Sequence, residues 1–242
     1  ALGTDQIAGL STTDVGVLTT TQLRALSSDQ VQALTSDQVR TLSSDQLNGL
    51  HTEQIASLTT AQIVALTTSQ LSTLPTSQLA AFTTAQIGAL DTGDIVALSA
   101  AQWASFTTGQ VASLQTNQIA AIETLDLAGL TTQQVNALTT DQFSKLSTAQ
   151  VALLTTAQIA AMETADLAAM TSSQLGELDA ITTTQLEGLS SSQLGMLRTA
   201  QIDALDSAAI AGLSTSQVAA FSSATIVSLS SGAVAALTGD QI

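Results

Sequence analysis

The sequence lacks cysteine and tyrosine, contains one proline and one histidine, and has aromatic side chains at only 2% of its 242 positions. The absence of cysteine excludes disulfide bonds, thiolate metal ligands and cysteine nucleophiles. Charged residues make up 10% of the chain, against roughly 25% in ordinary globular proteins. Hydrophobic residues still reach 45%, so the chain has enough apolar side chains to bury a core, which argues against generic disorder.

Positive charge is also scarce. The chain has four Lys and Arg against 19 Asp and Glu, for a net charge of −15, and Arg24, Arg40, Lys145 and Arg198 are scattered. Binding to a phosphate backbone depends on clustered cations, so we expect no nucleic-acid partner and no affinity for anionic membranes. No apolar run approaches the roughly 18 residues of a membrane span. The chain starts at Ala1 without a signal peptide, so we expect a processed or excised segment.

What the sequence does have is one repeat of eight residues. With Leu2 as position 1, an apolar residue recurs every eight positions through Met170, which gives 22 octads without a slip. The extra residues Leu178, Asp179 and Ala180 then shift the phase at 178–180, and seven further octads follow from Ile181. The consensus is L-[ST]-[ST]-x-Q-[ILV]-x-x, with small residues at positions 7 and 8. Since no linker interrupts it, the repeat predicts a single octapeptide-repeat domain over residues 1–242.

Three folds can host such a repeat. A single long helix drifts by about 80° per octad at 3.6 residues per turn, so its apolar residues would not form a stripe. A β-solenoid suits the Thr, Val and Ile content and stays open as the alternative, although positions 1 and 6 would face opposite sides of a strand. The third fold is a superhelix of very short helices.

Helix-start signals favour the third fold. Position 2 is usually Ser or Thr and position 5 is usually Gln, which is the spacing of a capping box. Acidic residues such as Asp29 and Asp37 stand at position 4, where they complement the positive end of a helix, and Pro75 stands at position 2, at a helix entrance. Each helix has room for about one and a half turns and is too short to be stable alone. We therefore predict an all-α solenoid with one very short helix per octad, with small residues at positions 7 and 8 letting its coils approach.

A longer period lies within the octads. Acidic residues recur at position 2 as Asp91, Glu123, Glu163 and Asp206, and similar text surrounds the last three. The spacing suggests that four to five octads form one superhelical turn. Duplication of a five-octad block is an equally good explanation.

The octad text resembles the long tandem L-[ST]-[ST]-x-Q-[ILV]-x-x arrays of very large secreted or surface-attached bacterial proteins, and the resemblance covers the whole chain. It implies an extracellular or cell-surface location and a structural or adhesive role. The shorter stretch 58-LTTAQIVAL-66 resembles the helix start of a TAL-effector repeat. Those repeats are about four times longer and carry a base-reading loop that is missing here, so this likeness reflects a shared helix-start signal.

Few residues suggest chemistry. His51 is the only histidine and stands at position 2, where we expect an exposed variant of the helix cap. Three pairs of carboxylates, each at positions 2 and 5 of one octad, are weak calcium candidates: Asp91 with Asp94, Glu123 with Asp126, and Glu163 with Asp166. The alternative is that each pair is a capping box with Asp in place of Gln. No known calcium-loop motif supports the metal, so no cofactor is expected.

Polar and aromatic side chains carry three further expectations. The Gln column at position 5 is expected to cap helices, to form hydrogen-bonded ladders along the stack, or both. The Ser and Thr hydroxyls at position 3 are expected to bond backbone at coil junctions. Trp103, Phe82 and Phe106 occupy core positions of their octads, so core packing is favoured over a binding patch.

The sequence predicts a non-enzymatic structural protein. No nucleophile, base and acid are arranged in a recognisable motif, while near-identical coils suit an extracellular bacterial scaffold or spacer that self-assembles into a fibre or tube. The expected partners are copies of the chain or neighbouring repeats of a longer one. The alternative function is an adhesin or ligand-binding module that presents a Ser/Thr-rich face.

Overall fold

The computed structural model describes residues 2–178, 185–186, 189–195, 197, 201–202, 205 and 207–242. These residues form short α-helices joined by turns and extended corners, and they contain no β-strand. The all-α solenoid prediction is therefore confirmed over the β-solenoid alternative. Asp179 and Ala180 of the predicted phase slip, and Asp206 and Arg198, lie outside the described residues.

Each helix begins at position 3 of its octad and ends at position 6, 7 or 8. The helices are α1 (Thr4–Ala8), α2 (Thr12–Gly16), α3 (Thr20–Arg24), α4 (Ser28–Gln32), α5 (Ser36–Thr41), α6 (Ser44–Asn48), α7 (Thr52–Ser57), α8 (Thr60–Ala65), α9 (Thr68–Thr73), α10 (Thr76–Ala80), α11 (Thr84–Ala89), α12 (Thr92–Ala97), α13 (Ala100–Ala104), α14 (Thr108–Ala112), α15 (Thr116–Ala121), α16 (Thr124–Ala128), α17 (Thr132–Asn136), α18 (Thr140–Ser144), α19 (Thr148–Ala152), α20 (Thr156–Ala161), α21 (Thr164–Ala169), α22 (Ser172–Gly176), α24 (Ser191–Leu194), α26 (Ser207–Gly212), α27 (Thr215–Val218), α28 (Ser223–Ser228) and α29 (Ser231–Ala236).

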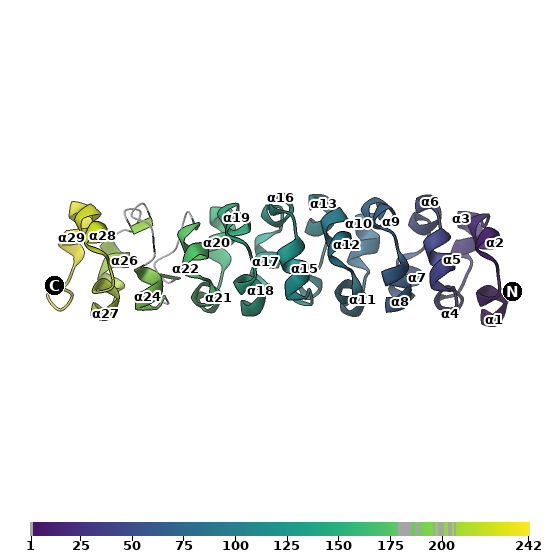
Figure 1. Ribbon diagram of the computed structural model, residues 1–242, viewed down its shortest axis with the longest axis horizontal. Helices are drawn as coiled ribbons and strands as arrows, with labels where there is room; N and C mark the ends of the chain where they lie inside the picture. Colours follow the sequence, from purple (N-terminus) through teal and green to yellow (C-terminus); the bar gives the residue numbers. More distant parts are fainter. Residues whose placement is uncertain are drawn as a thin grey trace. The chain divides into compact units, whose positions relative to one another are not determined.

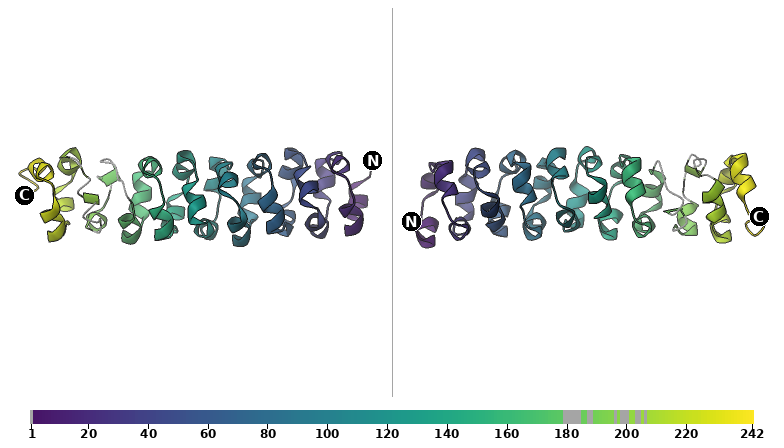
Figure 2. Two further views of the ribbon diagram at one scale, coloured as in Figure 1. Left: turned by 90° about the horizontal axis from the view of Figure 1, so that it is seen from above. Right: turned by 180° about the vertical axis from the view of Figure 1, so that it is seen from behind.

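The chain divides into two compact units, residues 1–129 with α1 to α16 and residues 130–242 with the remaining helices. The octad pattern runs through this boundary without a change in consensus. In each unit, successive helices wind around an axis and advance along it (Figure 1). The path of the chain from one helix to the next can be followed from two further sides in Figure 2.

Extended residues at positions 1 and 2 stop each helix after one to two turns. Leu66, for example, ends α8 with φ −59° and ψ 145°, and Thr67 begins the next helix as its N-cap with φ −87° and ψ 153°. None of the described residues has a positive φ. The corners therefore need no glycine, which explains why the octad carries no regular Gly at its turn.

Helices three octads apart pack against each other within each unit. In unit 1 these contacts join α2 to α5, α5 to α8 and α9 to α12, and in unit 2 they join α17 to α20 and α18 to α21. One turn of the superhelix therefore holds between three and four octads. The expectation of four to five octads per turn is wrong, because the longer period in the text does not match the spatial repeat.

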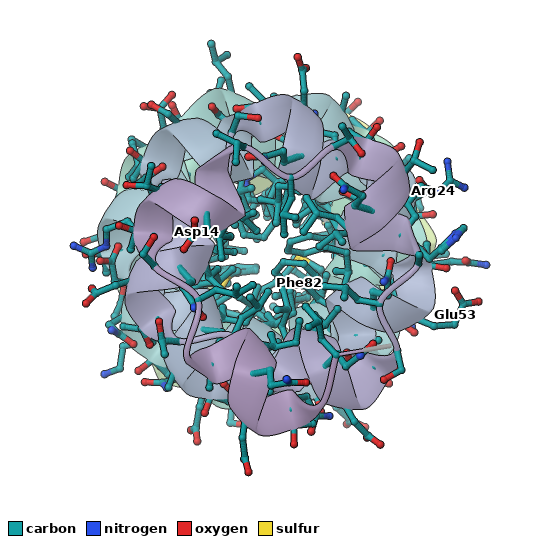
Figure 3. All side chains as sticks on the ribbon, turned by 90° about the vertical axis from the view of Figure 1, so that its right-hand side faces the viewer. Asp14, Arg24, Glu53 and Phe82 are labelled. Carbon is teal, nitrogen blue, oxygen red and sulfur yellow. The ribbon has the colours of Figure 1, made fainter. Side chains whose placement is uncertain are left out.

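The core follows the axis of the winding. Position 6 is almost completely buried in the described octads through Val218, as at Val15 and Trp103, which are both 0% exposed, whereas Ile226 and Val234 near the C-terminal end are 39% and 47% exposed. In unit 1, position 1 is also buried once a full turn has formed, from Leu34 onward at 4% exposed. Seen along the axis, Phe82 at position 1 points inward, while Arg24 and Glu53 lie on the outside (Figure 3). The Leu, Ile and Val side chains thus pack into one continuous apolar core in each unit. Burial in this core stabilises helices that are too short to be stable alone.

Small residues let neighbouring coils come close, as predicted. Gly49 stands at position 8, and a Cβ atom built there would lie 2.9 Å from the Cβ and Cγ2 atoms of Thr20, three octads earlier. A Cβ atom on Gly129 would lie 3.3 Å from the Cβ of Ala100, at the same octad separation. Backbone approach at these two positions therefore depends on the absence of a side chain.

Candidate functional site: the glutamine ladder

The most regular polar feature is the Gln column at position 5, and Gln86 shows how it works. Its Oε1 accepts a hydrogen bond from the backbone N–H of Thr83 at 2.7 Å, while the Thr83 hydroxyl accepts from the N–H of Gln86 at 3.2 Å. These two bonds form the capping box at the start of α11. The predicted helix-start signal is therefore confirmed.

The same amide also reaches the preceding turn. Gln86 Nε2 donates to the carbonyl oxygens of Ile55 at 3.0 Å, Ala56 at 3.3 Å and Leu58 at 2.6 Å. These carbonyls form the end of α7, where the last residues of a helix have no partner within the helix. One side chain thus caps the start of its own helix and the end of another helix, 28 to 31 residues earlier.

This arrangement recurs along both units, and we call it the glutamine ladder: the position-5 glutamines together with the backbone carbonyls that they reach. The bond to the position-1 carbonyl 28 residues earlier measures between 2.6 and 3.0 Å for the following members: Gln38, Gln46, Gln54, Gln62, Gln70, Gln78, Gln86, Gln102, Gln110, Gln118, Gln158, Gln174 and Gln217. Both functions expected of the column, capping and bonding along the stack, are present. The partner along the stack is backbone and not another glutamine.

Burial of the ladder begins once a full turn lies beneath it. Gln6 and Gln22 are exposed, whereas Gln38 is 2% exposed. A buried amide without partners is unfavourable by several kcal/mol, so these glutamines are tolerated in the core because the amide groups, as in Gln38 and Gln86, hydrogen-bond through both the oxygen and the nitrogen.

The phase slip at 178–180 changes the register of the ladder. Gln185 donates to the carbonyls of Ile159 and Met162, 26 and 23 residues earlier, and Gln201 donates to those of Leu175 and Leu178 at the same separations. Each separation is five residues shorter than in a regular turn. The slip therefore removes one octad from the turn and replaces it by three residues, and the ladder regains its 28-residue register at Gln217.

Pro75 leaves a gap that sequence reasoning missed. It is the N-cap of α10 and has no backbone N–H to donate. The Oε1 of Gln78 is consequently buried without a hydrogen-bond partner, although its Nε2 still donates to the Leu50 carbonyl at 2.8 Å. The signal was available in the sequence, since a proline at position 2 removes the donor that the glutamine needs.

Aspartate replaces glutamine at position 5 in four octads, and the consequences differ. Asp14 is exposed, and hydrogen bonds from the hydroxyl and the backbone N–H of Ser11 lower its pKa. Burial raises the pKa of Asp94 to about 6; the neighbouring carboxylate of Asp91 adds to this rise, and the Asp91 N–H opposes it. Burial is also the main cause that raises the pKa of Asp126 and of Asp166.

The calcium candidates are brought together only as pairs. Asp91 and Asp94 form a reciprocal capping box, with the Asp94 N–H donating to Asp91 Oδ1 at 2.8 Å and the Asp91 N–H to Asp94 Oδ2 at 3.2 Å. Glu123 and Glu163 make no side-chain cap bond to Asp126 and Asp166. Among the residues that the structure describes, no group of three or more His, Asp or Glu side chains is placed to hold a metal ion.

The expectation for position 3 is wrong in most octads. Its Ser and Thr residues are the first residues of the helices and are largely exposed. In the described part of the chain, bonds from these hydroxyls to backbone are made by Ser36 to the Ala61 carbonyl at 3.3 Å and by Ser207 to that of Gly232 at 3.4 Å. Position 2 does the capping, so position 3 is left facing outward.

His51 lies at the N-cap of α7 and is exposed, as predicted. Its side chain caps no backbone N–H. The Nε of Arg24 donates to His51 Nε2 at 3.4 Å, a contact across 27 residues that the octad pattern alone did not indicate.

The aromatic residues belong to the core. Trp103 is 0% exposed, Phe106 is 4% exposed, and their rings meet edge to face with centroids 5.0 Å apart. Phe82 is 3% exposed. Core packing, and not a binding patch, accounts for all three.

Two comparisons bear on this architecture. A family model described as the ALTTAQ repeat matches residues 10–44, 60–92, 87–122, 119–156, 176–207 and 192–223. These matches together cover well over half of the chain, and each spans about four octads, so the family unit is close to one turn of the ladder. No curated protein matches the sequence. None of the helices in the described ranges is long and apolar enough to cross a membrane.

Proposed function

The chain belongs to the ALTTAQ repeat family, and from that premise we propose that it is a non-enzymatic structural protein, a scaffold or spacer on the outside of a bacterial cell. The observation that carries the proposal is the glutamine ladder. The polar side chains that recur in the interior are used to join one turn to the next, as Gln86 does with α7. Such a coil can be lengthened without redesign, which suits a spacer.

The extracellular location rests on the resemblance of the octads to arrays in large secreted and surface-attached bacterial proteins. A net charge of −15 with only four cations is compatible with a solvated, non-adhesive coat. The absence of cysteine from the sequence leaves the fold independent of the redox state of its surroundings.

Self-assembly is part of the proposal, because the contact between turns uses the same groups in most of the described octads. Gln22 Oε1 accepts from the Thr19 N–H at 2.8 Å, and its exposed Nε2 has no acceptor in the described residues. An amide of this kind is able to donate to the helix-end carbonyls of a second copy, as Gln86 does within the chain. A heterologous contact of this kind generates filaments.

Electron microscopy across a concentration series tests the assembly. We expect filaments with the width of a single superhelix, and dispersed short monomers at every concentration would contradict self-assembly. The matched variant is Gln6→Glu with Gln22→Glu, since glutamate keeps the capping box but removes the amide donor. Its control is Gln32→Glu with Gln133→Glu, two exposed side chains that make no ladder bond, which changes the charge equally and should leave the filaments intact.

A second candidate function is an adhesin or ligand-binding module. The outward-facing hydroxyls at position 3, such as those of Thr60 and Thr84, favour it because they are free to meet a polar partner. A glycan array and an ice-recrystallisation assay test this candidate. Binding by the native chain that is lost when Thr60 and Thr84 are replaced by alanine would support this function over a passive spacer.

A further inference from the structure

The ladder has a break at Asp94 that sits in an otherwise regular stretch of unit 1. The neighbouring members donate to the position-1 carbonyl of the turn before them, Gln86 to Leu58 at 2.6 Å and Gln102 to Leu74 at 3.0 Å. By the same register, the residue at position 94 faces the carbonyl of Leu66, at the end of α8. A carboxylate has no hydrogen to donate there.

Both sides of this break are buried. Asp94 is 4% exposed and Leu66 is 5% exposed. Among the described residues, no backbone or side-chain donor reaches the Leu66 carbonyl oxygen. By this register the carboxylate of Asp94 and the carbonyl of Leu66 are two hydrogen-bond acceptors with no donor between them, which is unfavourable in a buried position.

One proton resolves the conflict. A protonated carboxyl group is a donor and an acceptor at once, so the acid form of Asp94 can keep accepting the Asp91 N–H and donate its own O–H to Leu66. Aspartate is shorter than glutamine by one methylene group, so α12 must move toward α8 to complete this bond. We infer that Asp94 is a proton-operated clasp: protonation joins α12 to the end of α8, and ionisation releases this one step of the ladder.

The surroundings of Asp94 leave few other charges to compete. It lies on α12, which packs against α9 and α15, and α8, α9 and α15 carry no titratable or charged side chain. Its capping partner Asp91 is the one charged group that faces it. Asp126 belongs, by the register of the ladder, at the opposite end of α12, beside the carbonyls of Ile95 and Leu98.

The direction of the pH effect follows from burial. Burial raises the pKa of Asp94 from 3.8 to about 6, so the folded state holds the proton more tightly than the unfolded state. The stabilising contribution is complete below the ordinary Asp pKa, is lost as the pH rises from about 4 to about 6, and stays absent above that. Mild acid therefore tightens this turn.

Carbon-13 NMR of the whole chain tests the clasp at the atoms involved. The carboxyl carbon of Asp94 should titrate with a midpoint near 6, and the carbonyl carbon of Leu66 should shift with the same midpoint. If the Leu66 carbonyl does not move while Asp94 titrates, the hydrogen bond does not form and the inference is wrong. A midpoint for Asp94 in the ordinary range for aspartate would also overturn it.

Hydrogen exchange measures the mechanical consequence. Asp94→Gln restores a permanent donor, so the protection of amides in α8 and α12 should be higher in this variant than in the native chain at pH 7. The ratio between the two should shrink as the pH falls to 5, by up to about tenfold per pH unit. A ratio that stays constant from pH 7 to pH 5 would contradict the clasp.

Two further variants keep the test decisive. Asp94→Asn has the size of aspartate with a fixed N–H donor, so it should behave like Asp94→Gln if the longer side chain fails to fit. Asp37→Asn removes an exposed carboxylate on α5 and controls for the general effect of charge. If Asp37→Asn removes the pH dependence of protection at α8 as strongly as Asp94→Gln does, the effect belongs to net charge and the inference fails.

Discussion

The glutamine at position 5 joins three pieces of backbone with one side chain. In Gln86, the oxygen serves the Thr83 N–H and the nitrogen serves carbonyls of the preceding turn. Each such bond contributes about 0.5–1.5 kcal/mol net, but leaving buried partners unsatisfied is worse, at about 1–3 kcal/mol per group. Removing the glutamine side chain is therefore expected to destabilise the fold mainly because it leaves buried backbone groups without hydrogen-bond partners.

Gln86→Met tests this at constant size. Methionine fills the same space but cannot donate to the buried Leu58 carbonyl or accept from Thr83, so we expect the local unfolding free energy to fall by about 2–3 kcal/mol. Hydrogen exchange of amides in α7 and α11 measures the loss. Gln32→Met is the matched control, because Gln32 is exposed and its side chain makes no hydrogen bond in the described residues. Equal effects of the two substitutions would show that the ladder does not stabilise the turn.

Pro75 offers a prediction in the opposite direction. Pro75→Thr returns an N–H to the orphaned Gln78 Oε1 and adds a capping hydroxyl, a gain of about 0.5–2 kcal/mol for the cap. The loss of proline rigidity in the unfolded chain offsets about 0.4–1 kcal/mol of this. We expect a net gain of about 1 kcal/mol, measured by urea unfolding followed by circular dichroism.

Pro75→Ala separates the two contributions, because it restores the N–H without the hydroxyl. It should fall between the native chain and Pro75→Thr. If Pro75→Thr is less stable than the native chain, the unpartnered Gln78 oxygen is not a weakness of the fold.

At the scale of the helix, the sequence predicted what is local and missed what depends on the winding. The box between positions 2 and 5 is an interaction across three residues, so helix starts and lengths followed directly from the consensus. The acceptors of the Gln nitrogen lie 28 and 31 residues away, and they could not be named without the number of octads per turn. The number of octads per turn is set by how closely neighbouring coils pack, as at Gly49 and Thr20. The sequence of a single octad does not reveal this packing.

The wrong prediction for position 3 has a related cause. Its near-constant Ser or Thr suggested a buried junction, but the residue faces outward at the first helical position. The consensus cannot distinguish a hydroxyl that caps from one beside it, because both positions carry the same residue types.

The octad itself should be removable as a unit. Deleting Ser27–Leu34 joins Leu26 to Thr35 and keeps every later residue in phase, so each helix finds an equivalent neighbour. We expect helix content per residue, measured by circular dichroism, to stay unchanged. Deleting only Ser27–Gln30 removes a helix start and leaves Val31 and Leu34 out of phase, which should destabilise the turn by about 2 kcal/mol per displaced side chain.

This pair of deletions is its own control, since the smaller deletion is predicted to do more damage. If the eight-residue deletion unfolds neighbouring helices as much as the four-residue deletion does, the coils are not interchangeable.

For the whole molecule, negative charges far outnumber positive ones. The net charge is −15, and exposed carboxylates such as Asp29, Asp37 and Asp45 lie in the first turns of their helices. Each benefits from the nearby helix N-terminus by about 0.3–1 kcal/mol, yet all of them repel one another over longer distances. The attraction acts at contact distance, while the repulsion acts across the spacing between helices, so salt weakens the two to different extents.

Raising NaCl from 0.01 to 0.1 M shortens the screening length from about 30 Å to about 10 Å. This change removes much of the long-range repulsion and little of the contact attraction, so we expect the thermal midpoint at pH 7 to rise by about 2–4 °C, equivalent to about 1 kcal/mol. Circular dichroism at low protein concentration measures it without assembly. Asp37→Asn with Asp45→Asn should reduce the salt effect, because fewer charges remain to be screened. A midpoint that falls with salt would mean that attraction between carboxylates and helix N-termini outweighs repulsion, and that the acidic surface stabilises the coil at low ionic strength.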